Sequence, residues 1–412
     1  ESYYSTFSLW DTFRAWNPLQ TLVDTALVND MIRSMLDMYD STGELPIWPL
    51  ASGETGTMIG YHAVSVIADA YLKGIRGYDA DKALEAMIRS SNINKKGSDY
   101  YTAQGYIPSN IKRESVSCTL EYAYDDWCIA QVARKLGKTE DAAALEEASR
   151  NYRNVFDKTT KLMRGRNENG EFQSPFSPYK WGDAFTEGNA WHYTWSVFHD
   201  VQGLAELMGG REGFAEMLDS VFVVPPIYDD SYYGTRIHEI TEMQVADMGN
   251  YAHGNQPAQH MIYLYNYAGQ PWKAQYWTRE VMDRLYSSKP DGYCGDEDNG
   301  QTSAWYVFSA MGFYPVCPAS DQYVIGSPLF RKATVKLENG KKIVIEAPDN
   351  APENRYIGTM KLDGKRYDRN FIRWSDLVKG AKIDFAMQPD PAYKRGVGPQ
   401  DAPYSLSREE CR

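Results

Sequence analysis

The fold class follows from residues 24–39, which read DTALVNDMIRSMLDMY. Their apolar side chains recur three and four residues apart in one broad stripe, which consists of Leu27, Val28, Met31, Ile32, Met35, Leu36 and Met38. Residues at that spacing share one face of a helix, so the pattern predicts an amphipathic helix. The run Ser41-Thr-Gly43 predicts where this helix ends.

The same apolar spacing recurs along the chain up to about Gly312. We expect further helices at Gly60–Ile75, Asp79–Ser90, Leu120–Leu136, Thr139–Phe156, Asp200–Met208, Gly213–Val221, Gln256–Ala268, Pro271–Leu285 and Gln301–Met311. Gly, Pro, Asn or Asp residues separate each segment from the next. This many helices, with no convincing strand between them, predict a mainly α fold. A toroid of paired helices fits better than a four-helix bundle, which has too few helices.

Beyond Pro315 the sequence changes to an alternation of apolar and polar residues. The alternating segments are 332–338, 342–346, 359–363, 371–374 and 383–387, punctuated by Asn339-Gly340, Asp363-Gly364 and Lys379-Gly380. We therefore predict a helical domain over residues 1–315 and a small antiparallel β region over residues 316–412. Hairpins this short need a partner surface, so we expect them to pack on the helices or on a domain absent from this chain.

The composition is that of a soluble globular protein, with 43% hydrophobic and 24% charged residues. A length of 412 residues fits one large domain plus a smaller one. The net charge of −12 argues against nucleic acid or an anionic membrane as a partner, because both require a basic surface. The sequence has no apolar run of about 18 residues, so it predicts no membrane span. Aromatic residues make up 14% of the chain and suit sugar binding, although buried rings fill cores equally well.

Five cysteines (Cys118, Cys128, Cys294, Cys317 and Cys411) show no C-x-x-C spacing, so zinc and redox motifs are unsupported. Their odd number leaves at least one free thiol. The chain opens at Glu1 without an initiator Met or a signal peptide, within sequence that reads as ordered structure. We therefore expect a fragment or a processed chain.

Three consecutive acids lie between glycines just before the predicted helix at Gln301, in the stretch GYCGDEDNGQTSAWY, residues 292–306. Asp296 and Asp298 alternate in this loop, so both carboxylates can point the same way and activate a water molecule. Glu297 between them should point away. The alternative is a solvated acidic turn in which Asp298 or Asn299 caps the helix.

Two further stretches combine an acid with aromatic residues. Glu187 precedes a Gly-Asn break and the run Ala-Trp-His-Tyr-Thr-Trp195, where loss of water would raise its pKa toward that of a general acid. A helix-capping Glu is the alternative. Trp10 and Asp11 fit a sugar pocket, with the ring stacking and the carboxylate accepting from hydroxyls. The alternative is a helix-start pair of Asp11 with Arg14.

Two polar interhelical loops carry candidate metal and substrate ligands, at residues 236–243 and 253–257. Glu242 and Asn255, brought together with Asp298, would suit calcium better than zinc, which prefers His or Cys at set spacings. His238 and Glu239 are adjacent and can both face a substrate, although a lone His is more often structural. Motifs of the phosphate-binding and nucleophilic-serine kinds are absent.

Taken together, six motifs in order from about Ser5 to Gln388 resemble the catalytic half of glycoside hydrolase family 92. They are Ser8-Leu-Trp-Asp-Thr-Phe-Arg14, Glu187-Gly-Asn-Ala-Trp191, Gly254-Asn-Gln-Pro257, the run 263–272 (YLYNYAGQPW), the run 295–315 from Gly-Asp-Glu-Asp-Asn-Gly to Phe-Tyr-Pro, and Ile325-Gly-Ser-Pro-Leu-Phe330. The resemblance implies a calcium-dependent, inverting exo-α-mannosidase that acts on mannose-rich glycans. It also implies an (α/α)6 barrel that follows an N-terminal β-sandwich, which we expect to be missing from this sequence, and a periplasmic or extracellular location.

The resemblance also implies roles for individual residues. Glu187 corresponds to the general acid, and Asp298, assisted by Asp296, to the general base. Glu242 and Asn255 are the expected calcium ligands. The pair His238-Glu239 is similar to one that holds the leaving sugar in members selective for α-1,2 linkages.

One position departs from the family pattern, because many relatives carry Glu where this chain has Gln256. An amide there would make the calcium site less negative and weaken its affinity for the metal. Two alternative functions remain open at this stage. One is a non-catalytic mannoside-binding fragment, and the other is a mannosyl-phosphodiester glycosidase, against which the retained acid Glu187 argues. A purely structural helical repeat would not explain so many carboxylates and amides in linkers.

Overall fold

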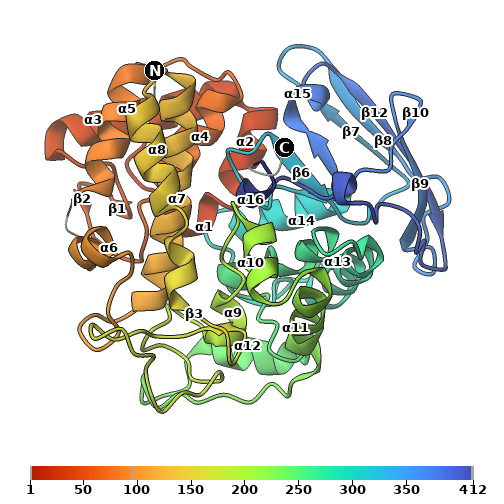
Figure 1. Ribbon diagram of the computed structural model, residues 1–412. Helices are drawn as coiled ribbons and strands as arrows, with labels where there is room; N and C mark the ends of the chain where they lie inside the picture. Colours follow the sequence, from red (N-terminus) through yellow and green to blue (C-terminus); the bar gives the residue numbers. More distant parts are fainter. Residues whose placement is uncertain (1, 94–95, 410–412) are drawn as a thin grey trace.

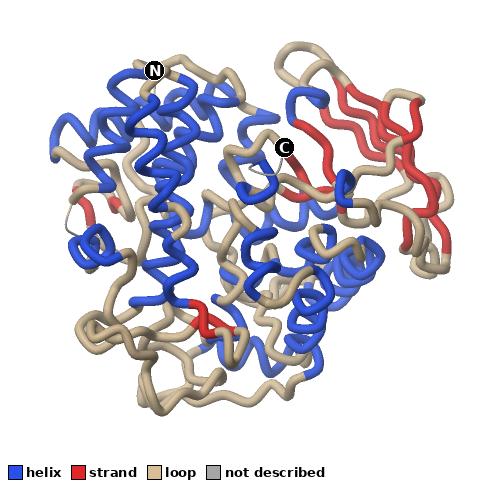
Figure 2. The backbone as a smooth tube through the Cα atoms, in the orientation of Figure 1, coloured by secondary structure: helices blue, strands red, loops and turns tan. Residues whose placement is uncertain are grey.

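The computed structural model describes residues 2–93 and 96–409 and consists mainly of helices, with a β-sheet at one side (Figures 1 and 2). The α-helices are α1 (Leu9–Thr12), α2 (Trp16–Val23), α3 (Thr25–Thr42), α4 (Ala63–Leu72), α5 (Ala80–Ser91), α6 (Ser98–Gln104), α7 (Ser115–Lys135), α8 (Thr139–Ala148), α9 (Ala190–Tyr193), α10 (Val201–Leu207), α11 (Arg211–Val223), α12 (His238–Ala246), α13 (Pro271–Leu285), α14 (Gln301–Met311), α15 (Trp374–Leu377) and α16 (Leu406–Glu409). The 3₁₀ helices are η1 (Asn151–Val155), η2 (Gln256–Ala258), η3 (Met261–Asn266) and η4 (Pro399–Asp401). The predicted mainly α fold is confirmed.

Local sequence signals set the ends of several helices. The Asp24 carboxylate accepts a hydrogen bond from the Leu27 N–H at 2.9 Å and so starts α3, and Gly43 ends it with a φ of 81°. The helices α13 and α14 have the bounds that the apolar spacing predicts.

Other helices depart from the prediction. The stretch 236–243, expected as a loop, contains the start of α12 at His238, whereas the expected helix at 256–268 is two 3₁₀ segments, η2 and η3. The expected helix at 139–156 ends at Ala148 and is followed by η1. Helices α2 and α6 were not expected.

The strands of the C-terminal part form two sheets, of five and three strands. The five-stranded sheet has the order β10-β9-β12-β8-β7 and the three-stranded sheet the order β11-β6-β5. Their members are β5 (Phe313–Tyr314), β6 (Gln322–Ile325), β7 (Lys332–Lys336), β8 (Lys342–Glu346), β9 (Tyr356–Leu362), β10 (Lys365–Arg366), β11 (Phe371–Arg373) and β12 (Ala381–Gln388). The expectation of a purely antiparallel region is wrong, because β12 runs parallel to β8.

Two short hairpins also lie among the helices, contrary to the expectation of no strand there. They pair β1 (Pro49–Leu50) with β2 (Gly53–Glu54) and β3 (Phe156–Asp157) with β4 (Leu162–Met163). Strand β5 lies before residue 316 and pairs with β6 after it, so one sheet crosses the predicted boundary between the two domains.

The C-terminal sheet contacts the helical part of the chain. Strand β9 contacts α13, where the Gln275 side chain accepts a hydrogen bond from the Ile357 N–H at 2.9 Å. The buried guanidinium of Arg279 on the same helix donates to Asn350 at 2.7 Å. Apolar and polar contacts together therefore join the two parts of the chain.

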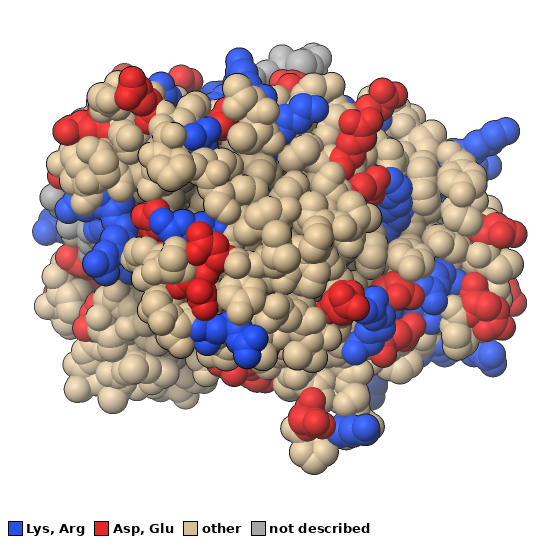
Figure 3. All heavy atoms as spheres, turned by 90° about the horizontal axis from the view of Figure 1, so that it is seen from below, with Lys and Arg blue, Asp and Glu red and all other residues tan. Residues whose placement is uncertain are grey.

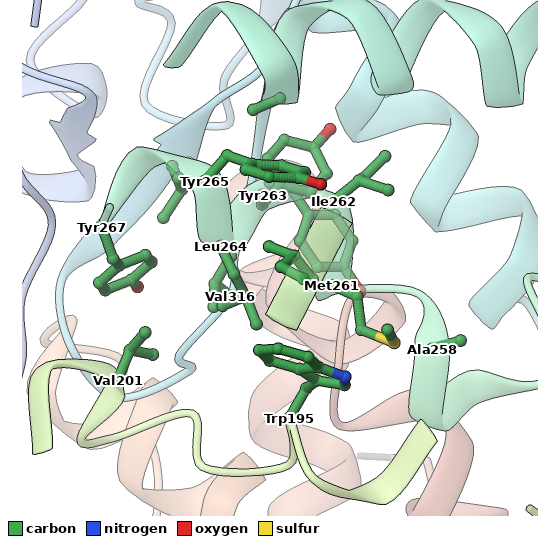
Figure 4. Close-up of a cluster of buried hydrophobic side chains, with 14 of the residues drawn as sticks. Trp195, Val201, Ala258, Met261, Ile262, Tyr263, Leu264, Tyr265, Tyr267 and Val316 are labelled. Atoms are coloured by element: carbon green, nitrogen blue, oxygen red, sulfur yellow. The ribbon is translucent and has the colours of Figure 1, made fainter. Parts of the chain in front are cut away.

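The segment from Met261 to Tyr267 lies at the centre of the largest apolar core (Figure 4). Each of its residues from Met261 to Asn266 is fully buried, and Trp195 and Val316 pack around it. Because side chains on every side of this segment are buried, it has no solvent-facing stripe. A second core lies among α3, α4, α5 and α7.

The last described residues return to the middle of the chain and dock on α10. The buried carboxylate of Asp200 accepts hydrogen bonds from Ser405 Oγ, from Ser407 Oγ and from the Ser407 N–H, at 2.8 to 2.9 Å. It also accepts from the Tyr152 hydroxyl at 2.7 Å. These donors hold the pKa of Asp200 below its usual value although burial opposes this.

The surface mixes charges of both signs. On the face seen from below in Figure 3, basic side chains are interspersed with acidic ones around broad uncharged areas. Across the described residues, every helix is too short or too polar to cross a membrane. Four cysteines, Cys118, Cys128, Cys294 and Cys317, are free thiols, and Cys411 lies outside the described residues.

Candidate active site

The three carboxylates of the acidic loop before α14 have different contacts. Glu297 accepts hydrogen bonds from the Gly300 N–H at 2.8 Å and from Ser303 Oγ at 2.6 Å, so it satisfies the start of α14. Its two carboxylate oxygens are therefore engaged at the start of α14. The alternative in which Asp298 or Asn299 caps the helix is wrong, because Gly300 occupies the N-cap and Glu297 supplies the carboxylate.

Asp298 does not cap α14, and its backbone adopts an energetically unfavourable conformation. Its φ is 53°, in the left-handed region that non-glycine residues seldom adopt. The Gln256 side-chain amide donates a hydrogen bond to its carboxylate. Burial raises the pKa of Asp298, the Gln256 hydrogen bond lowers it, and the charge of Asp296 raises it further. Asp296 itself is 72% exposed.

Glu187 lies on another loop, just before α9, also with a positive φ of 46°. Asn189 caps α9 through its own side chain, so the capping alternative for Glu187 is wrong. The Asn255 amide donates to the backbone oxygen of Glu187 at 3.1 Å and to its Oε2 at 3.2 Å. Burial, followed by the charge of Glu239, raises the pKa of Glu187 to about 7, and the Asn255 hydrogen bond opposes this rise. The carboxyl is therefore substantially protonated near neutral pH.

The first turns of α12 place three ionisable side chains together. His238 Nδ1 lies 2.8 Å from Glu242 Oε1, and its Nε2 lies 3.2 Å from Glu239 Oε1. The same Nε2 lies 3.9 Å from Asp296 Oδ2, which connects α12 to the acidic loop. Partial burial would lower the pKa of His238, but the Glu242 hydrogen bond and the Glu239 charge raise it.

Several buried oxygens of this region accept no hydrogen bond from the described residues. They are Glu239 Oε2, Glu242 Oε2 and Gln256 Oε1. A Cβ on either Gly254 or Gly295 would come within 3 Å of Glu242 Oε2, so the two glycines leave room at this oxygen. Unpartnered carboxylate and amide oxygens are the ligand types that calcium prefers.

The described residues contain no group of three His, Cys, Asp or Glu side chains arranged to hold a metal. A cation at Glu242 would therefore depend on amide and backbone oxygens as well. Asn255 uses its amide nitrogen for Glu187, which leaves only its oxygen for a cation. Carboxylate, amide and backbone oxygens together would fit a hard cation such as calcium.

Asp11 belongs to the same electrostatic environment. It is 2% exposed, and its Oδ2 lacks a hydrogen-bond partner among the described residues. Burial and then the charge of Asp298 raise the pKa of Asp11 well above its usual value, while Arg14 lowers it and Glu187 raises it. A buried carboxyl oxygen without a partner is a group that a ligand hydroxyl would satisfy.

Trp10 is not placed as the sequence suggested. Its ring is 2% exposed and its indole N–H donates to Glu121 at 3.0 Å. The expectation that it stacks on a sugar is corrected, because a buried ring has no open face.

The catalytic-domain profile of glycosyl hydrolase family 92 matches residues 1–389. The chain belongs to glycosyl hydrolase family 92. Among solved structures, it is similar to the family GH92 alpha-mannosidase BT3965 of Bacteroides thetaiotaomicron, with 42% identity and a TM-score of 0.91 over 98% of this chain and 52% of that one. The inverting mannosidase BT2199 of the same organism shares 48% identity, with a TM-score of 0.89 over 97% of this chain and 55% of that one.

A curated relative of this family 92 chain, described as an uncharacterized secreted glycosidase, comes from Arthroderma benhamiae. It is 27% identical over an alignment of 420 positions, which covers 92% of this chain and 51% of the relative. The chain thus spans about half the length of the relatives that it matches.

Sequence reasoning missed two glutamines of this family 92 site. Gln256 was considered only for the metal, whereas its amide contacts Asp298. The side-chain oxygen of Gln301 accepts hydrogen bonds from the N–H groups of Ala15 and Trp16, at 2.9 and 3.1 Å, and so holds the α1–α2 corner against the acidic loop. In the sequence, Gln301 is marked only as an amide residue at the first position of a predicted helix.

Proposed function

We propose that this chain carries the acid and base of an inverting exo-α-mannosidase, selective for α-1,2 linkages in mannose-rich glycans. One observation carries the proposal: the carboxyl groups of Glu187 and Asp298, on separate loops, have surroundings that act differently on their pKa values. Burial and the Glu239 charge raise the pKa of Glu187 to about 7, so a large share of it holds its proton near neutral pH. Burial also raises the pKa of Asp298, but there the Gln256 hydrogen bond opposes the rise and favours the ionised form. Opposite protonation states of two carboxyl groups are what acid–base cleavage of a glycoside requires.

In the proposed reaction, Glu187 donates its proton to the glycosidic oxygen as the bond to the anomeric carbon breaks. Asp298 takes a proton from a water molecule that attacks the opposite face of that carbon, and Asp296 assists through its negative charge. Inversion requires the two carboxyl groups to lie roughly 6.5 to 9.5 Å apart, which leaves room for the water. The name of BT2199, an inverting mannosidase, supports this stereochemistry.

The remaining polar groups suit substrate binding. Asp11 offers its unpartnered Oδ2 to a hydroxyl of the terminal mannose, and His238 with Glu239 would hold the leaving sugar. Glu242 and the Asn255 amide oxygen would hold calcium, together with backbone oxygens nearby. When bound, the ion would orient the hydroxyls of the terminal mannose and favour a distorted ring.

The proposal extends to the architecture and location of the protein. Helix α7 packs against α4, α5 and α8, which supports the (α/α)6 barrel that the family resemblance implies. The relatives are about twice as long as this chain, which supports a further β-sandwich domain as a partner. The secreted relative supports a periplasmic or extracellular location.

The test is to incubate the full chain with α-1,2-, α-1,3- and α-1,6-linked mannobiose, with and without EDTA. We expect cleavage of the α-1,2 isomer first, release of β-mannose and loss of activity in EDTA that calcium restores. Tight mannoside binding without product would instead indicate a non-catalytic fragment, and faster cleavage of a mannosyl phosphodiester would change the substrate class. The variant Asp298→Asn should lose nearly all turnover and keep its fold, and normal activity in it would refute the assignment.

A further inference from the structure

A buried cluster of charges contacts the segment that carries Asp11. Its centre is Glu121, in the middle of α7 and 1% exposed. Glu121 Oε1 accepts a hydrogen bond from the Trp10 indole at 3.0 Å and from the Tyr193 hydroxyl at 3.4 Å. Its Oε2 lies 3.0 Å from His62 Nε2. A carboxylate is buried this completely only where its partners compensate for the lost water.

Two cations balance the carboxylates of this cluster. His62 bridges Glu121 and Asp125, with Nδ1 lying 2.8 Å from Asp125 Oδ1. Burial alone would lower the pKa of His62, but Asp125 and then Glu121 raise it to about 9, so the ring is charged at neutral pH. The Arg14 guanidinium forms the second cation, 3.8 Å from Glu121 Oε1.

Both groups that connect Glu121 to the site flank Asp11 in the sequence. Trp10 precedes Asp11, and Arg14 follows it by three residues and donates from Nε to the Trp10 backbone oxygen at 3.0 Å. The Glu121 carboxylate therefore contacts the segment 10–14 at both ends.

The residues that flank this segment, Ser8 before it and Ala15 and Trp16 after it, are attached to the acidic loop and the start of α14. Asn299 donates to Ser8 Oγ at 2.7 Å, and Gln301 accepts from the N–H groups of Ala15 and Trp16. A Cβ on Gly300 would lie 2.1 Å from the Trp16 ring, so the loop fits closely against the α1–α2 corner. Helix α1 is thus attached to Glu121 through Trp10 and, through the residues that flank it, to the residues that follow Asp298.

We propose that Glu121 is a positioning residue that holds Asp11 in place through Trp10 and Arg14, with His62 as its counter-ion. The proposal rests on the proposed function, because Asp11 is the group through which Glu121 reaches the substrate. Glu121 itself transfers no proton to the sugar. Its role is to fix the segment that presents the Asp11 carboxylate beside Asp298 and Glu187.

The test is a comparison of Glu121→Gln, Asp11→Asn and the double variant in the full chain. Glutamine keeps the volume of the side chain and an acceptor for Trp10 but removes the charge that pairs with His62 and Arg14. We expect kcat/KM on α-1,2-mannobiose to fall by about 10- to 100-fold, since small misplacements of binding groups have effects of that size. In the Asp11→Asn background, the same substitution should cost less than about twofold, because its effect passes through Asp11.

Asp126→Asn is the matched control. Asp126 lies on the same helix and is 4% exposed, but its carboxylate accepts from the hydroxyls of Tyr61 and Tyr101, at 2.7 and 3.0 Å. This variant should lower the unfolding midpoint in urea and leave kcat/KM of the folded protein within about twofold of wild type. Equal losses of kcat/KM in the two variants would show a general effect of core damage and overturn the proposal.

A second readout does not depend on activity. The indole ¹H–¹⁵N resonance of Trp10, assigned with Trp10→Phe, should shift and exchange faster with solvent in Glu121→Gln but not in Asp126→Asn. If wild type cleaves no mannoside, the proposed function fails while this readout still tests the contact. An unchanged resonance, or full additivity with Asp11→Asn, would overturn the positioning role. If Glu121→Gln does not fold, Trp10→Phe takes its place in the comparison with Asp11→Asn. The losses of kcat/KM in these two variants should again be non-additive.

Discussion

Replacing Glu187 with Gln should stabilise the folded protein at alkaline pH while it removes the proposed general acid. Burial raises the pKa of Glu187 from 4.5 to about 7, with the charge of Glu239 as the next cause. The folded chain therefore binds this proton more tightly than the unfolded chain does. Wild-type stability must fall as the pH rises from about 4.5 to about 7, and the variant lacks this penalty.

The size of the effect follows from the same pKa. Each pKa unit corresponds to about 1.4 kcal/mol, so the full penalty above pH 7 is at most about 3 kcal/mol. At pH 5 most of the penalty has not yet developed. Urea unfolding of both proteins at pH 5 and pH 8 should show that the stability difference shifts in favour of the variant by about 2 to 3 kcal/mol.

The catalytic side of the same substitution is measured on two substrates. Loss of a general acid lowers turnover of α-1,2-mannobiose by about 10² to 10⁴-fold. A mannoside with a good leaving group, such as dinitrophenolate, should retain most of its rate because departure needs no proton. Unfolding curves that keep the same separation at pH 5 and pH 8 would refute the burial argument. Equal losses of rate on the two substrates would refute the role of Glu187 as acid.

Three further predictions concern other parts of the chain. Gln256→Glu places a second carboxylate against Asp298, so the acid limb of the pH profile of kcat/KM should move to higher pH by about one unit, and an unmoved limb would contradict the contact. His238→Ala should lower kcat/KM about tenfold on α-1,2-mannobiose and less than about twofold on the α-1,3 isomer, and equal losses would argue against a leaving-sugar role. Asp200→Asn weakens several buried hydrogen bonds and should cost about 2 to 4 kcal/mol in urea unfolding, while a loss below about 0.5 kcal/mol would show that the C-terminal contact adds little.

The helices that the sequence predicted best are those with local signals at their ends. The Asp24 cap and Gly43 define α3, and Pro271 stands at the first position of α13. Helix α12 was missed because it lacks such signals: its N-cap is Ile237, which provides no side-chain hydrogen bond. That helix is stabilised by tertiary packing of Ile240 and Met243 against Trp181.

Tertiary structure also decided features that no local pattern encodes. The alternation of β8 and β12 suits a parallel or an antiparallel neighbour equally well, and strand order placed them parallel. Residues Met261 to Asn266 are buried on all sides, so their apolar content could not distinguish an α-helix from the 3₁₀ segment that forms.

For the candidate site, the sequence predicted the carboxylates better than their partners. Glu187, Asp298 and Asp11 were selected by residue type and context, and their charges act on one another in the structure. The amide of Gln256 reaches Asp298 across 42 positions of the chain, a contact that depends on the fold. The contact of Trp10 with Glu121, which is 111 positions away, likewise depends on the fold.

The contact between Asp200 and residues 405–407 has a consequence for synthesis of the protein. Asp200 leaves the ribosome some 200 residues before the serines that donate to it, so its carboxylate cannot be buried with its full set of partners until the end of the C-terminal sheet region has been made. During that interval α10 lacks its cover and the helical part remains incomplete. The protein should therefore reach its native state in a late step, when Ser405 and Ser407 dock, and a stalled chain that ends before them should be the form that chaperones and proteases recognise.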